Sequence, residues 1–178
     1  MRLLWYRTDK EPWVFALILG AIAGIFVLTF MGVFAYQKER HTRSAEKHAV
    51  NVHCLARNVY YEARGEPIAG QYAVAEVTMN RKASRRFPRT VCEVVYQMNW
   101  DPIRKRNVGA FSWTEFNSLP EPDGAEWERA LKVADAVYYE KEPPKVKGAL
   151  FYHANYIKPD WAREKRQVAK IGRHIFYR

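Results

Sequence analysis

An unbroken run of 24 residues without a charged side chain, from Trp13 to Tyr36, limits what the first part of this chain can become. A helix needs about 20 mainly apolar residues to cross a bilayer, and the aromatic residues at both ends suit the two membrane interfaces. The alternative is a cleaved signal peptide, with Val33-Phe34-Ala35 as the cleavage site. Because the apolar part of a signal peptide has only about 7–15 residues, we expect an uncleaved transmembrane anchor at 13–36, preceded by a cytoplasmic segment at 1–12.

The residues after this run are polar and carry charges of both signs. Residues 37–50 show no clear apolar face, and we expect a charged linker or a helical extension of the anchor. The length of 178 residues allows about one domain, which we assign to residues 51–178. Basic residues flank the apolar run in nearly equal numbers, so charge does not fix its orientation.

Hydrophobic spacing predicts a predominantly helical α+β domain with a small β-sheet. The first helix has apolar residues at the spacing of one buried face: Val52, Leu55, Ala56, Val59 and Ala63. Gly65 and Pro67 then end it. The expected helices cover about 49–64, 66–82, a short segment ending near 97, and 125–140. Two strands are expected at about 149–153 and 173–177, and residues 99–124 are expected to form a long irregular loop, where functional residues often lie.

Glu62 is the residue with the most specific chemical potential. It lies at the end of the first predicted helix, beside Tyr60, Tyr61 and the stem of Arg64. A partly desolvated carboxyl group beside aromatic rings has a raised pKa and donates a proton near neutral pH, which is the chemistry needed to cleave a glycosidic bond. The competing interpretation is an ordinary solvated surface charge.

Several motifs in order resemble the SleB-type cell wall hydrolases, which include spore-cortex-lytic enzymes. They are Glu-Ala-Arg-Gly-Glu at 62–66, Gly70-Gln71, the run at 73–81, Phe87-Pro88, residues 90–97, Phe111 to Thr114, Phe151 to Ala154, and residues 171–177. The resemblance covers about residues 52–178. It implies a lysozyme-like catalytic domain related to lytic transglycosylases, with the first Glu of the motif, Glu62, as the catalytic acid.

The reaction type follows from the number of carboxylates. Ordinary glycosidases use two, but Glu66 is expected to complement the start of the second helix and Glu76 to be solvated. Asp101, Glu115 and Asp123 lie in the predicted loop. A single carboxylate suffices for lytic transglycosylation, in which Glu62 acts first as acid and then as base. This route needs no cofactor, and none is expected.

Two alternatives stay open. The first is an N-acetylmuramoyl-L-alanine amidase, zinc-dependent if His153 and His174 join a carboxylate around a metal. The second is a non-catalytic peptidoglycan-binding module.

Aromatic and amide side chains at the motif positions are the candidates for binding the sugars: Gln97, Phe111, Ser112, Trp113, Tyr152 and His153. Core packing is the alternative for Phe111 and Tyr152. Family members often carry Gln before the Phe-Ser pair, whereas this chain has Ala110 after an atypical segment, Asn-Trp-Asp-Pro-Ile-Arg-Lys-Arg at 99–106.

Cys54 and Cys92 are the two cysteines of the chain. They are either two buried small hydrophobic residues or, in an oxidising compartment, one disulfide that closes a loop of about 40 residues.

The charge balance fits an anionic partner outside the cell. The net charge is +10, and a basic surface attracts anionic wall polymers or a membrane face. The basic residues are dispersed, which argues against nucleic acid. We therefore expect peptidoglycan glycan strands as the partner, with residues 13–36 in the inner membrane as a single pass and the catalytic domain on the periplasmic side.

Overall fold

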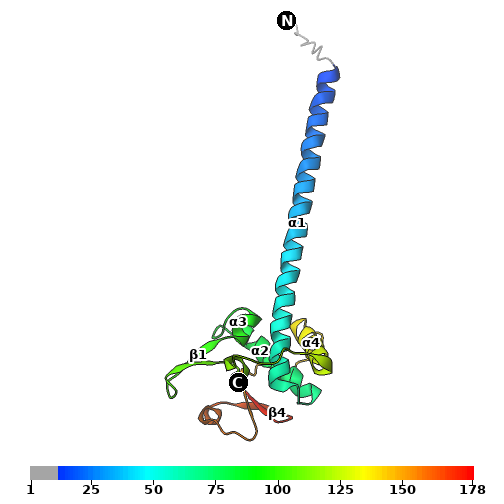
Figure 1. Ribbon diagram of the computed structural model, residues 1–178. Coiled ribbons are helices and arrows are strands. Elements are labelled where there is room, and N and C mark those ends of the chain that lie inside the picture. Colours follow the sequence, from blue (N-terminus) through cyan, green and yellow to red (C-terminus); the bar gives the residue numbers. More distant parts are fainter. Residues whose placement is uncertain (1–11) are drawn as a thin grey trace, which may run out of the picture. The chain divides into compact units, whose positions relative to one another are not determined.

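The computed structural model describes residues 12–178, and Figure 1 shows their helices and strands. The cytoplasmic segment expected at 1–12 lies, apart from its last residue, outside the described residues. The chain divides into two units, Met1–Glu46 and Lys47–Arg178. Helix α1 has the bounds Pro12–Ala63. Residues 37–50 are helical throughout, which is the second of the two alternatives that the sequence left open. Among the described residues, α1 is the one helix long and apolar enough to cross a membrane, and a signal sequence would meet the same criteria.

The break after α1 is as the sequence predicts. Glycine and proline follow at positions 65 and 67, and α2 begins directly after the proline, at Ile68–Ala83. The carbonyl of Pro67 accepts hydrogen bonds from the backbone N–H groups of Gly70 and Gln71. Pro67 is the N-cap residue, with φ −54° and ψ 152°, so it lies just outside α2, where its missing N–H costs no helical hydrogen bond.

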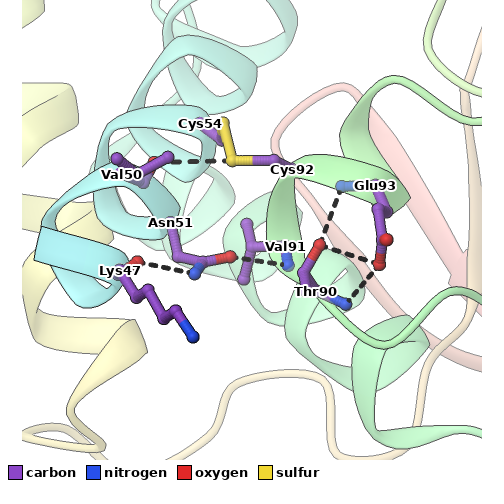
Figure 2. The surroundings of a disulfide bond; sticks show 8 residues. All are labelled: Lys47, Val50, Asn51, Cys54, Thr90, Val91, Cys92 and Glu93. Atoms are coloured by element: carbon purple, nitrogen blue, oxygen red, sulfur yellow. Dashed lines mark hydrogen bonds between the residues drawn. A yellow bond between two sulfur atoms is a disulfide. The ribbon is translucent and has the colours of Figure 1, made fainter. Parts of the chain in front are cut away.

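A short helix, α3 (Val91–Val95), is fixed to α1 by covalent and polar contacts. Cys54 of α1 and Cys92 of α3 form a disulfide, with Cα atoms 5.2 Å apart (Figure 2). Beside it, Oδ1 of Asn51 accepts a hydrogen bond of 2.9 Å from the backbone N–H of Val91. Thr90 and Glu93 complete a capping box at the start of α3, which satisfies donors that a helix start leaves unpaired.

The expectation of an irregular loop at 99–124 is wrong for its first half. Strands β1 (Met98–Asp101) and β2 (Arg106–Gly109) form an antiparallel hairpin, and the 3-10 helix η1 (Ser112–Glu115) follows. Turn-forming residues such as Asp101 and Pro102 favour a hairpin as much as a loop, so composition alone did not separate the two. Helix α4 (Gly124–Tyr138) comes next, close to its predicted range.

The C-terminal part forms a three-stranded antiparallel sheet in the order β3-β5-β4. The strands are β3 (Phe151–Ala154), β4 (Gln167–Ile171) and β5 (His174–Tyr177), and the 3-10 helix η2 (Asp160–Glu164) lies between β3 and β4. The sequence missed β4, since Gln167 and Lys170 are exposed and the strand carries only a weak apolar pattern.

Two hydrophobic clusters form the core of the second unit. The first joins the apolar face of α1, including Leu55 and Val59, to α3 and α4. The second joins α2 to the sheet, with Phe176 of β5 fully buried. The predicted helix-rich α+β class with a small sheet is confirmed, and the end of α1 lies where the two clusters meet.

Candidate active site

A cleft of about 610 Å³ opens beside the last turn of α1. Its walls come from α1, η1, β3, β5 and the segment between β3 and β4. Aromatic side chains make up much of the lining: Tyr61, Trp113, Phe116, Tyr152, Tyr156 and Trp161. Such rings offer flat apolar faces, which suits a ligand whose ring has an apolar C–H face and polar substituents at its edge.

Glu62 lies in this cleft and is partly buried. Burial raises the pKa of its carboxyl group above the usual value. The Tyr152 hydrogen bond and the charge of Arg81 lower this pKa, but their effect is smaller than that of burial. The hydroxyl of Tyr152 donates a hydrogen bond of 2.9 Å to Oε2 of Glu62. Within the described residues, no hydrogen bond engages the other oxygen, Oε1. The carboxyl group is thus held at one oxygen and available at the other.

Arg81 of α2 supports this pair from the protein interior, and the sequence did not identify it. Its Nε donates a hydrogen bond of 2.8 Å to the carbonyl of Leu150, and its guanidinium lies 5.0 Å from the ring centroid of Phe111. Burial lowers the pKa of Arg81, and the charges of Tyr152 and Glu62 counteract this. Burial also raises the pKa of Tyr152 well above its usual value, which keeps its hydroxyl a donor.

Trp113 is positioned by a buried network between three elements. Its indole Nε1 donates a hydrogen bond of 2.9 Å to Oδ1 of Asn58 on α1. The amide nitrogen of Asn58 in turn donates to the hydroxyl of Thr78 on α2, at 3.1 Å. The Trp113 ring stacks on Tyr61 with centroids 4.6 Å apart. Because all these polar groups are paired, the wall of the cleft is fixed in one arrangement.

Glu66, the second carboxylate of the motif, has a structural role. It accepts hydrogen bonds from the backbone N–H of Arg173, at 2.8 Å, and from the guanidinium Nε of the same residue, at 2.7 Å. Burial acts to raise its pKa, but these hydrogen bonds and the nearby His174 outweigh burial and lower it. Gly172 has a φ of +56°, and a Cβ at that position would collide with Glu66. The carboxylate therefore binds Arg173 and holds the β4–β5 turn against the segment between α1 and α2.

Glu76 was expected to be solvated, but the structure shows that it is buried. Its carboxylate accepts hydrogen bonds of 2.7–2.8 Å from the backbone N–H groups of Lys145 and Val146. Asp101 accepts from two backbone N–H groups in the β1–β2 turn, and Glu115 forms an ion pair with Arg106. Within the described residues, Glu62 is the only carboxylate among those that line the cleft.

The structure separates the six residues predicted to bind sugar into two groups. Ser112, Trp113, Tyr152 and His153 line the cleft, and Gln97 and Phe111 do not. Phe111 is 3% exposed and packs in the first core cluster, which was its alternative. The side chain of Gln97 donates to Asn99 at the start of the hairpin.

His153 is tied on both ring nitrogens. Nδ1 lies 2.9 Å from the carbonyl of Ala154 and Nε2 lies 2.9 Å from the hydroxyl of Tyr177. Because a carbonyl only accepts, Nδ1 carries the proton. Nδ1 of His174 lies 3.9 Å from Oε2 of Glu66, and burial lowers the pKa of this histidine. Across residues 12–178, no three His, Cys, Asp or Glu side chains form a group that could hold a metal ion.

The sequence missed three of the six aromatic residues that line the cleft. Phe116, Tyr156 and Trp161 lie in segments of irregular structure or 3-10 helix, where no periodicity marks an inward face. The aromatic character of these residues was the one signal that could have identified them, since functional residues often lie in loops. Phe116 is 63% and Tyr156 is 79% exposed.

Comparison with known proteins gives consistent matches over this unit. The profile of the cell wall hydrolase family matches residues 65–177. The spore cortex-lytic enzyme of Bacillus cereus is 32% identical over 127 residues, which is 71% of this chain and 43% of that protein. The enzyme of the same name from Bacillus subtilis is 30% identical over 126 residues, 71% of this chain and 37% of that protein. The chain thus spans less than half the length of these curated relatives.

Solved structures match the same region. The catalytic domain of the germination-specific lytic transglycosylase SleB from Bacillus anthracis is 29% identical, with a TM-score of 0.52 over 72% of this chain and 93% of that domain. The catalytic domain of the Bacillus cereus SleB protein is 30% identical, with a TM-score of 0.53 over 72% and 89%, respectively.

Proposed function

Because this chain belongs to the SleB-type cell wall hydrolase family, we propose that it cleaves the glycan strands of peptidoglycan by lytic transglycosylation, with Glu62 as acid and base. The observation that carries this proposal is the Glu62 carboxyl group itself. It is the one carboxylate of the aromatic cleft among the described residues, its pKa is raised, and Oε2 is held by Tyr152. The family profile begins three residues after Glu62, so its role rests on this geometry.

In the first step, protonated Glu62 donates its proton to the glycosidic oxygen that leaves C1 of muramic acid. Burial keeps this proton on the carboxyl group at a higher pH than in water. Tyr152 engages Oε2, so Oε1 is the oxygen that faces the sugar. General acid catalysis of this kind contributes about 10²–10⁴-fold to a rate.

In the second step, Glu62 as carboxylate takes the proton of the C6 hydroxyl of the same muramic acid. The C6 oxygen then bonds to C1 and closes a 1,6-anhydro ring. The proton taken from the C6 hydroxyl leaves Glu62 protonated again, so that the enzyme is restored without water. Between the steps the carboxylate is stabilised by the Tyr152 hydroxyl and by the charge of Arg81.

The fates of the other carboxylates support a route with one catalytic carboxyl group. A retaining glycosidase needs a second carboxyl about 5–5.5 Å away, and an inverting one about 6.5–9.5 Å away. Glu66 and Glu76 are committed to backbone N–H groups, and neither lines the cleft. Tyr61 and Trp161 would stack on the sugar rings, with Trp113 supporting the Tyr61 ring from below and Ser112, Tyr152 and His153 at polar positions.

We also propose the cellular placement and the lysozyme-like architecture. Residues 13–36 would anchor the chain in the inner membrane, with residues 1–12 in the cytoplasm and residues 51–178 on the periplasmic side. The support is the length of the apolar segment, the location of peptidoglycan, and the Cys54–Cys92 disulfide, which suits an oxidising compartment.

The decisive experiment is digestion of purified peptidoglycan by the detergent-solubilised full chain, followed by mass spectrometry of the fragments. Lytic transglycosylation yields 1,6-anhydromuropeptides. Fragments whose reducing ends are one water heavier than the anhydro form would show hydrolysis of the glycosidic bond instead. Freed stem peptides would show that the enzyme is an amidase. Activity lost with a chelator and restored by zinc would also contradict the proposal.

A further inference from the structure

The β1–β2 hairpin exposes large apolar side chains that the proposed reaction does not use. Ile103 in the turn is 91% exposed, Trp100 is 63% exposed and Met98 is 52% exposed. Within the compact unit Lys47–Arg178, no other large hydrophobic residue is as exposed as Ile103. Exposed apolar clusters on a folded domain usually mark an interaction site.

The pairing of the hairpin explains why one of its faces stays uncovered. Met98 and Trp100 are two residues apart on β1, so their side chains share one face. Their cross-strand partners are Gly109 and Asn107, respectively. Neither partner offers an apolar surface that would cover the Trp100 ring.

The turn that presents Ile103 is well ordered by its own hydrogen bonds. Oδ1 of Asp101 accepts hydrogen bonds from the backbone N–H groups of Ile103, at 2.8 Å, and Arg104, at 3.0 Å. Lys105 adopts a positive φ of 52°, which closes the turn. Ile103 therefore projects into solvent from a fixed turn rather than from a frayed loop.

Three consecutive basic residues follow the apolar tip. Arg104 pairs with Asp101 at 3.6 Å and Arg106 pairs with Glu115 at 2.7 Å. Lys105 forms no ion pair within the described part of the chain. The tip thus combines a projecting isoleucine, a nearby tryptophan and an excess of positive charge.

We propose that this hairpin tip, Trp100 to Arg106, inserts into the headgroup region of an anionic lipid bilayer. Tryptophan favours the membrane interface, Ile103 would enter the acyl boundary, and the basic residues would be attracted to anionic headgroups. The charge and the single projecting tip favour this occupant over a second copy of the chain, which carries the same net positive charge. A sugar strand offers no apolar phase for Ile103.

The length of the chain makes such a contact attainable. Ten residues, 37–46, separate the apolar run from the compact unit, and ten helical residues span about 15 Å. If residues 13–36 enter a bilayer, the hairpin is kept at a high effective concentration near its surface. The proposal concerns where the domain works and is independent of which peptidoglycan bond it cleaves.

The test uses a fluorescent label at the tip of the full chain. Both native cysteines are bonded to each other, so Ile103→Cys supplies one free thiol for an environment-sensitive dye. The labelled chain is placed in nanodiscs of phosphatidylcholine alone or of equal parts phosphatidylglycerol and phosphatidylcholine. We expect a blue-shifted emission and a several-fold lower quenching by iodide in the anionic discs. The matched control is Ile68→Cys, at an isoleucine that is 51% exposed at the start of α2.

Charge variants and salt complete the design. Arg104→Gln with Lys105→Gln, and ionic strength raised to about 1 M, should each return the signal to its value in phosphatidylcholine. Equal iodide quenching at positions 103 and 68 in anionic discs would overturn the proposal. So would protection that appears only on adding peptidoglycan, or that rises with protein concentration in detergent, since these outcomes assign the tip to glycan or to a second copy.

Discussion

The hydroxyl of Tyr152 donates a hydrogen bond of 2.9 Å to Oε2 of Glu62, across 90 residues of sequence. The pair joins the end of α1 to strand β3, and the charge of the buried Arg81 acts on it. It defines which carboxyl oxygen is held and which is available, and it moderates a pKa that burial raises. The first three predictions concern this pair.

Replacing Glu62 by Gln should lower the rate of anhydromuropeptide formation by at least about 10²–10⁴-fold, because the proton donor is lost. The Gln oxygen still accepts from Tyr152, so the fold should be kept. Circular dichroism and the melting temperature check folding, and mass spectrometry checks turnover. Retained turnover by a folded variant would refute the role of Glu62.

The same variant should be more stable than the wild type at neutral pH. Since the folded-state pKa of Glu62 is raised, its ionisation destabilises the native state as pH rises above about 4.5, the unfolded value. The difference in unfolding free energy between the variant and the wild type should grow as pH rises above this value and should vanish below it. Urea unfolding at several pH values measures it, and a difference that is independent of pH would contradict the raised pKa.

Tyr152→Phe should move the alkaline limb of the pH–rate profile to higher pH. The hydroxyl lowers the pKa of Glu62, so its loss lets burial raise that pKa further. The acid form then persists to higher pH, while the carboxylate needed in the second step is stabilised less and the maximal rate falls. A profile that falls in amplitude without shifting would mean that Tyr152 only positions the substrate.

Glu66→Gln should destabilise the fold by about 2–3 kcal/mol at pH 7, because two hydrogen bonds to a charged acceptor are weakened. The lowered pKa of Glu66 means that its stabilisation is present above about pH 4.5 and is lost as pH falls through the folded-state value. Urea unfolding at several pH values should show that the wild type loses this stabilisation at low pH and that the variant does not. If activity per folded molecule collapses while stability does not, Glu66 is a second catalytic carboxylate.

Reduction of the Cys54–Cys92 disulfide should lower the free energy of unfolding by about 3–4 kcal/mol, as expected for a closed loop of this length. Urea unfolding of the wild type with and without reductant measures the effect. The double variant Cys54→Ser with Cys92→Ser is the control, and it should not respond to reductant. An equal response in both would assign the effect to reductant rather than to the bond.

Much of the fold followed from local pattern. The helix ends at Gly65 and Pro67 were predictable because these residues act on their own backbone. The hairpin at 98–109 and strand β4 were not, since their apolar residues are few and partly exposed, and pairing rather than sequence pattern defines them. Glu76 was misjudged for a related reason. Its partners are backbone N–H groups 69–70 residues away.

The sequence by itself determined the apolar segment at 13–36 and the family motif that contains Glu62, because both are encoded in consecutive residues. Only the tertiary structure decided which carboxylate faces the cleft and which are structural. That choice depends on burial and on hydrogen-bond partners from distant segments: Tyr152 and Arg81 for Glu62, Arg173 for Glu66. A carboxyl group has the same chemistry everywhere in a chain, and its solvation and neighbours give it a role.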